Sequence, residues 1–268
     1  MKTRMISLLN LLLAAAIHAS LPTIPFSGSS GATMGAGSLV GWERNGLGAN
    51  PAVSDAHCTS VSIAGYSPFG IDEVSVAEGT ASWDGDRFGA SISYRGLYSS
   101  DGFTSSVWQV QGAARLGWGF ALGISGQFQS DENLQDYGEG AGILWNKFSF
   151  LSLGTSIETS PLLQGREITG GFGGDIGTTL GIGYAWRISA EEFYSTYKDV
   201  EYRFGMMLRL HSLLSIHGGW SPQAQTMALG IRFGMGNWEG FSAIRRHSAL
   251  GTTSIQGLHW RKNLKADP

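Results

Sequence analysis

The sequence predicts an all-β protein: a transmembrane antiparallel up-and-down β-barrel of about 14 strands, with an N-terminal hatch inside the lumen. Three observations predict this fold. Apolar residues alternate with small or polar ones along most of the chain, which is the period of a β-strand. Charged residues are only 15% and glycines number 40 of 268, unlike an ordinary soluble domain. No segment after the leader is a continuous apolar run of about 18 residues, so a barrel is the remaining way to span a membrane.

The first 19 residues are interpreted as a secretory signal peptide. Lys2 and Arg4 give a positive start, residues 5–17 are mostly apolar, and small residues follow. An apolar core of about 13 residues is too short to cross a bilayer as a helix and is typical of a signal peptide. We expect cleavage after Ala19, with Ala16 as the alternative. The leader indicates an exported protein.

Residues 20–56 are predicted to form a hatch, or plug, inside the lumen. The segment carries Glu43, Arg44, an Asn50-Pro51 turn and Asp55. A barrel of this width would enclose a water-filled pore if nothing occupied it, and proline fixes the backbone just before the wall begins. We expect the charged side chains to face lumenal charges. The alternative is a periplasmic lead-in without fixed structure.

Residues 57–262 are predicted to form the barrel, and 263–268 a C-terminal tail. In residues 118–129 one face would carry Trp118, Phe120, Leu122 and Ile124, and the other only glycine, alanine, serine and glutamine. Longer loops are expected at 130–136 and 160–173. The strands are expected at 57–66, 73–83, 86–98, 104–115, 117–129, 137–146, 148–158, 174–187, 188–197, 201–210, 212–220, 224–235, 237–247 and 250–260. An even strand number would bring both chain ends to the periplasmic side.

Aromatic residues favour a membrane barrel over a soluble β-sandwich. They recur at the ends of the apolar faces, as in Trp118 and Phe128, or Tyr137 and Trp145. Transmembrane barrels carry such aromatic girdles where the wall crosses the two membrane interfaces. A sandwich would also alternate, but it would hide its apolar face in a core. The placement of the aromatic residues is explained less well by that alternative.

The opposite face of the strands is expected to line the lumen. It consists of small and polar residues with scattered charges, and buried charges need partners. Glu158, Glu191, Glu201 or an inserted segment would supply some of them. The charges expected to face the lumen are Arg87, Arg95, Arg115, Asp175, Arg187, Arg203, Arg209 and Arg232.

No motif predicts catalysis, a cofactor or a metal site. His211-Ser212 and His247-Ser248 are adjacent on expected strands, so their side chains would point to opposite faces. The sequence GGFGGD at 170–175 occurs once and is interpreted as a loop running into a strand, since calcium-binding β-rolls repeat it. The net charge of −3 gives no reason to expect nucleic acid. We therefore predict that the chain is not an enzyme.

The stretch before the first expected strand resembles two outer-membrane families. It reads GATMGAGSLVGWERNGLGANPAVSDA (31–56) and contains Gly35-Ala36-Gly37 and Asn50-Pro51-Ala52. In these features it is similar to the FadL-like long-chain fatty acid transporters and to the PorV/PorQ family associated with type IX secretion. The resemblance implies a 14-strand barrel with a lumenal hatch. The chain is shorter than the transporters and lacks their long apolar loops and a final aromatic residue, so the PorV/PorQ layout fits better.

Two functions follow as expectations, both in the outer membrane of a Gram-negative-type cell. The first is transport of small or hydrophobic molecules across that membrane. The alternative is a non-transporting platform that docks secreted proteins or type IX secretion components. A purely structural barrel is a third reading. The expected partners are outer-membrane lipid, and either a small hydrophobic solute or a secretion-machinery protein.

Overall fold

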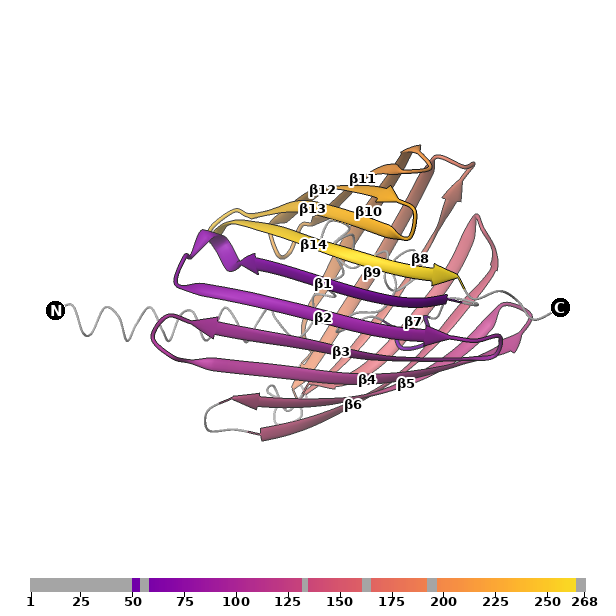
Figure 1. The fold of residues 1–268 in the computed structure, drawn as a ribbon. Coiled ribbons are helices and arrows are strands. Elements are labelled where there is room, and N and C mark those ends of the chain that lie inside the picture. The colour runs from indigo at the N-terminus through magenta and orange to yellow at the C-terminus, as the bar shows by residue number, and fades with distance from the viewer. Residues whose placement is uncertain (1–49, 54–57, 132–134, 161–164, 192–196, 264–268) are drawn as a thin grey trace.

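The computed structural model describes residues 50–53, 58–131, 135–160, 165–191 and 197–263. In these ranges fourteen strands form one closed antiparallel barrel (Figure 1), which confirms the predicted fold class. The strands are β1 (Cys58–Ser67), β2 (Val74–Asp84), β3 (Phe88–Ser99), β4 (Thr104–Gly117), β5 (Phe120–Asp131), β6 (Gln135–Phe148), β7 (Leu151–Ser160), β8 (Gly165–Ile176), β9 (Leu180–Glu191), β10 (Tyr197–His211), β11 (Leu214–Ser221), β12 (Thr226–Met235), β13 (Trp238–His247) and β14 (Gly251–Asn263).

The first and last strands close the barrel. Figure 1 shows indigo β1 beside yellow β14, and their register runs from Cys58 opposite Asn263 to Ser67 opposite Ser254. Every other strand pairs with its neighbours in sequence. Closure leaves no unpaired sheet edge, so the backbone polar groups of the wall are satisfied within the wall itself.

The described connections differ between the two ends of the barrel. At the end where β1 begins, turns of two or three residues join the strands, at 85–87, 118–119, 149–150, 177–179, 212–213 and 236–237. Trp118 and Gly119 complete one of these turns with φ of 56° and 83°, a region that glycine adopts at little cost. At the other end, residues 68–73 include a short 3-10 helix, η1 (Pro68–Gly70), and 100–103 form a longer turn. Short turns at one end of the barrel and longer connections at the other are typical of outer-membrane barrels.

The two faces of the wall have opposite chemistry. On β5, Ile124 is 70% exposed on the outer face while its neighbour Ser125 is 8% exposed on the inner face. Outward apolar side chains of this kind occur on all the other strands whose side chains are described. The inner face buries serine, threonine, glutamine and arginine. This is the reverse of a soluble domain, which keeps its apolar face inside.

Aromatic side chains of neighbouring strands form a row on the outer face. Tyr94 on β3 lies opposite Trp108 on β4, Trp108 opposite Phe128 on β5, and Phe128 opposite Tyr137 on β6. The ring centroids of Tyr94 and Trp108 are 4.6 Å apart, and those of Phe128 and Tyr137 are 5.1 Å apart. Cross-strand aromatic pairs stabilise a sheet, and their outward position fits an interface girdle.

The prediction was wrong at one part of the wall. The expected loop at 160–173 contains most of β8, and a turn at 177–179 interrupts the strand expected at 174–187. Glycine-rich sequence has low β-propensity, but its backbone still pairs. Gly171 lies opposite Ala185 and Gly173 opposite Gly183. Gly177, with φ of 66°, makes the turn that ends the strand.

Several sequence predictions lie outside the described residues. They are the signal peptide, nearly all of the 20–56 segment, and residues 264–268 of the expected tail. Among the described residues, no helix has both the length and the apolar character needed to cross a lipid bilayer.

Candidate functional site in the barrel lumen

Polar side chains follow one another around the inner face of β1 to β4. Ser60 and Ser82 share a hydrogen bond of 2.7 Å between their hydroxyl oxygens. Thr80 donates to Ser93 at 3.0 Å, and Ser91 donates to Gln111 at 3.1 Å. Each bond joins neighbouring strands, so the inward alternation predicted from the sequence becomes a hydrogen-bonded lining.

Residues Asn50 to Val53 lie inside the barrel against β5 and β6. Asn50 donates from Nδ2 to the carbonyl of Ile143 at 3.0 Å, and its Oδ1 accepts from the backbone N–H of Ala52 at 3.0 Å. The N–H of Val53 donates to the carbonyl of Asn50 at 2.9 Å, which closes a turn. Ala52 is fully buried and packs with Val53, Ala121 and Leu144. The predicted turn at Asn50-Pro51 is therefore a packed part of the lumen.

Two inward glycines make this approach possible, and we call Gly123 and Gly142 the glycine seat. A Cβ on Gly123 would lie 2.1 Å from the carbonyl carbon and oxygen of Pro51. A Cβ on Gly142 would lie 2.0 Å from Oδ1 of Asn50 and 2.9 Å from Cδ of Pro51. No side chain fits into such a contact. The turn is thus positioned by the shape of the wall together with the Asn50 hydrogen bonds.

A buried ion pair joins β2 to β3 on the inner face. Arg95 donates from Nε to Oε1 of Glu78, and the two residues lie directly opposite each other in the register. Arg95 is 3% exposed and Glu78 is 8% exposed. A buried charge is tolerated when such a partner is present. Arg95, predicted from alternation to face the lumen, occupies this pair.

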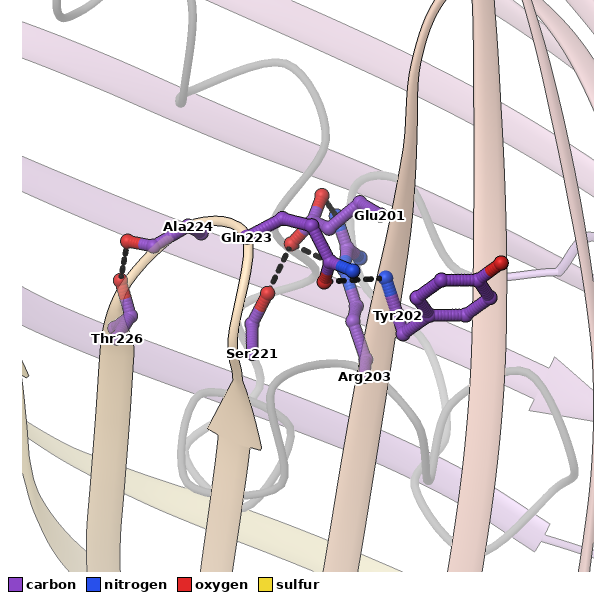
Figure 2. Close-up of polar contacts among 7 residues, drawn as sticks. All are labelled: Glu201, Tyr202, Arg203, Ser221, Gln223, Ala224 and Thr226. Carbon is purple, nitrogen blue, oxygen red and sulfur yellow. Dashed lines mark hydrogen bonds and ion pairs between the residues drawn. The ribbon is translucent and has the colours of Figure 1, made fainter.

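A second polar cluster lies near the start of β10. Arg203 donates to Glu201 from Nε at 3.0 Å and from Nη2 at 2.9 Å. Ser221 of β11 donates to the same carboxylate at 2.9 Å. Figure 2 shows Glu201, Arg203 and Ser221 converging on one side of the wall, while the Tyr202 ring points away. Gln223 accepts from the Tyr202 N–H at 3.1 Å and links the β11–β12 connection to β10.

Three further predicted arginines lie toward the end with short turns. Arg209 contacts Asp175 at 3.2 Å, and Arg232 contacts Glu239 at 3.6 Å. Arg115 donates to the carbonyl of Asp86 at 3.0 Å and lies 4.0 Å from Asp84. Arg232 thus contacts the adjacent strand β13, whereas Arg209 reaches past β9 to β8 and Arg115 reaches past β3 to β2 and the β2–β3 turn.

The remaining predicted site residues lie either in a turn or outside the residues that the structure describes. Arg87 is exposed in the β2–β3 turn, because β3 begins one residue later, at Phe88. The side chain of Arg187 lies outside the described residues, as do Glu43, Arg44 and Asp55.

Sequence reasoning missed an apolar part of the lumen. The residues concerned face inward near the end with longer connections: Tyr66, Val74, Val76 and Leu97. Val76 lies opposite both Tyr66 and Leu97, one inward position along the strands from the Glu78–Arg95 pair. Phe241, Ala243 and Ile255 complete the buried cluster. The signal was present in the sequence, since Val74 and Val76 share the face of Glu78. The otherwise polar lumen thus has this apolar cluster in addition to the smaller one around Ala52.

The described lumenal side chains are better suited to binding solutes than to catalysing a reaction. Ser215 and His217 share a hydrogen bond of 2.8 Å, with His217 only 1% exposed. Across the described ranges, no group of three or more His, Cys, Asp or Glu residues is arranged to hold a metal ion. The lumen combines hydroxyls, amides and ion pairs, which bind and orient solutes.

Comparison with known proteins shows a likeness of fold. No protein-family profile and no curated protein matches the chain. The structure is similar to that of the CymD monoaromatic hydrocarbon channel, with a TM-score of 0.62, 8% identity, and coverage of 92% of this chain and 99% of that one. It is also similar to the outer membrane protein Omp33 of Acinetobacter baumannii, with a TM-score of 0.51, 13% identity, and coverage of 78% and 100%.

Proposed function

We propose that the protein is an outer-membrane barrel that carries small or hydrophobic molecules across the outer membrane. The observation that supports this most is the reversal of the two faces, with exposed apolar side chains around a polar lumen. That arrangement suits a barrel with lipid outside and solute inside. The similar barrels are named as a hydrocarbon channel and an outer membrane protein, which agrees with this proposal. Outer-membrane lipid is then the first partner.

The N-terminal segment 20–56 is proposed to be the hatch of this lumen. Support comes from Asn50 to Val53, which occupy space inside the barrel against the glycine seat. The finer assignment, to the FadL-like or PorV/PorQ families, is part of the proposal and rests on the motifs in residues 31–56. In this scheme a shift of the hatch widens the path along the lumen.

Solute flux into liposomes tests the proposal. Detergent-purified protein is reconstituted with and without residues 31–56, and the uptake of small solutes is measured. We expect low uptake with the full chain and clearly higher uptake with the deletion variant, because the deletion removes the Asn50–Val53 turn from the lumen. Heat-modifiable gel mobility confirms that both barrels are folded. Background uptake by both folded forms would contradict transport.

The packed turn also favours a second candidate function. Asn50 is 2% exposed and Ala52 is fully buried, so the lumen wall and the turn form one packed unit. A barrel obstructed in this way would suit a non-transporting platform that docks secreted proteins or type IX secretion components. Background flux, combined with co-purification of a defined secretion protein from the native membrane, would support this alternative.

A further inference from the structure

One lumenal carboxylate lacks the arginine that its counterparts have. Glu158 on β7 faces the lumen, and its Oε1 is buried without a hydrogen-bond partner. Within the described part of the chain, no ion pair reaches it. The lumenal carboxylates that do contact arginine are Glu78 with Arg95, Asp84 with Arg115, Glu201 with Arg203, Asp175 with Arg209, and Glu239 with Arg232 and Arg261.

A second carboxylate lies directly across from Glu158. Glu158 is opposite Glu167 of β8 in the register, and side chains in such positions are about 5 Å apart at Cβ. Glu167 is 9% exposed and also faces the lumen. Like charges directly opposite each other destabilise a sheet. A cation bound at Glu158 would weaken that repulsion.

A hydroxyl points toward the same place from the other side. Ser125 of β5 is 8% exposed, and its Oγ has no hydrogen-bond partner among the described residues. Gly140 of β6 lies between Ser125 and Glu158 in the register. A Cβ on Gly140 would be 2.5 Å from the Ser125 Oγ and 2.9 Å from the Glu158 Cγ. Both side chains therefore lean over this glycine toward each other.

We propose that Ser125 and Glu158, beside Glu167, form a binding site for a monovalent alkali cation on the lumen wall. Carboxylate and hydroxyl oxygens are hard ligands that suit such ions. The site offers too few protein ligands for calcium, which takes about 6–8 oxygens. It contains no aromatic ring, whereas recognition of organic ammonium groups uses rings. This inference deepens the proposed transport function, because the site would make the lumen prefer cations over anions.

Reversal potentials in planar bilayers test the selectivity. All proteins in this measurement carry the deletion of residues 31–56. Under a KCl gradient, the deletion variant with no other change is expected to prefer K⁺ over Cl⁻. Glu158→Gln should lower the permeability ratio by about fivefold, the effect of one charge a few ångströms from an ion in water. Glu139→Gln is the matched control, since it makes the same change on the outer face of β6, next to Gly140. An unchanged ratio in Glu158→Gln would overturn the inference while leaving transport intact.

Sodium binding can be measured even if none of the proteins conducts ions. Sodium-23 line broadening is recorded with the full-length proteins in detergent. We expect excess broadening with wild type and with Glu139→Gln, and its loss in Glu158→Gln and, to a smaller extent, Ser125→Ala. Equal broadening in all four proteins would overturn the cation site. Loss of broadening in Glu158→Gln together with background flux would support the site and contradict the transport proposal alone.

Discussion

At the scale of single residues, the glycine seat determines whether the N-terminal turn can lie in the lumen. Gly123→Ala would place a methyl group 2.1 Å from the Pro51 backbone, so the turn must leave its position. The reporter is Ala52→Cys in a Cys58→Ser background, which lacks the native thiol. Residue 52 is fully buried, so we expect little maleimide labelling in the reporter alone and rapid labelling once Gly123→Ala is added.

The control for this experiment is on the same strand. Gly126 of β5 faces outward, and a Cβ there would meet nothing within 4 Å. Gly126→Ala should therefore leave the labelling of residue 52 slow. The role of the glycine seat would be contradicted if Gly123→Ala and Gly126→Ala gave the same slow labelling.

Asn50 contributes hydrogen bonds in addition to shape. Its Nδ2 donates to the Ile143 carbonyl, and its Oδ1 accepts from the Ala52 N–H. Leaving a buried group unsatisfied costs about 1–3 kcal/mol. Asn50→Asp keeps the acceptor but removes the donor, and should lower the free energy of unfolding in lipid vesicles by that amount. Chemical denaturation measures it; equal stability of Asn50→Asp and wild type would show that the Ile143 contact contributes nothing.

The contacts that position the described part of the hatch region, Asn50 to Val53, could not be predicted from the sequence alone. From the sequence, charged side chains were expected to fix it by facing lumenal charges. In the described residues, backbone contact with glycines and two amide hydrogen bonds position Asn50 to Val53. Alternation predicted that Gly123 and Gly142 face inward, but not which segment would approach them. A contact between segments about 70 to 90 residues apart depends on barrel closure, which local patterns do not encode.

At the scale of elements, paired charges link adjacent strands. The Glu78–Arg95 pair joins β2 to β3 in a buried part of the lumen. Breaking such a pair by removing one partner costs about 3–5 kcal/mol, because the other charge stays buried alone. We expect that loss in Glu78→Gln and in Arg95→Met, and a loss no larger than one single variant in the double variant. A double-mutant cycle from urea unfolding in vesicles checks this; additive losses would show that the two side chains act independently.

Strand prediction succeeded where side chains alternate in size and failed where they do not. On β5, Phe120, Leu122 and Ile124 alternate with small inward residues, and the strand spans 120–131 against the expected 117–129, with Trp118 in the turn before it. On β8 the sequence TGGFGGD offers one large side chain, Phe172, so the period was not visible. The wall still continues there, because strand pairing needs only the backbone groups that glycine also has. The separate strand expected at 188–197 was also wrong, since its first residues are the end of β9 (Leu180–Glu191). This extra strand offset the missed β8, so the total strand number was unchanged.

At the scale of the whole molecule, the exposed apolar face requires an apolar environment around the barrel. Side chains such as Ile124, Leu229 and Met227 are each more than half exposed. A contiguous apolar surface of this extent is not stable in water, whereas lipid satisfies it. The same closure that removes sheet edges also turns the polar face inward, so one alternating pattern supplies both the membrane contact and the solute path.

A charge scan of the outer face tests this environment directly. Ile124 lies near the middle of β5 and is 70% exposed. In lipid, Ile124→Arg should lower the free energy of unfolding by about 2–4 kcal/mol, the cost of arginine at the bilayer midplane. Leu250→Arg is the control, because Leu250 is 45% exposed in the β13–β14 turn, outside the strands, and should change stability by less than about 0.5 kcal/mol. Equal, small effects at both positions in vesicles would mean that β5 does not face lipid, since an exposed arginine in water carries no such cost.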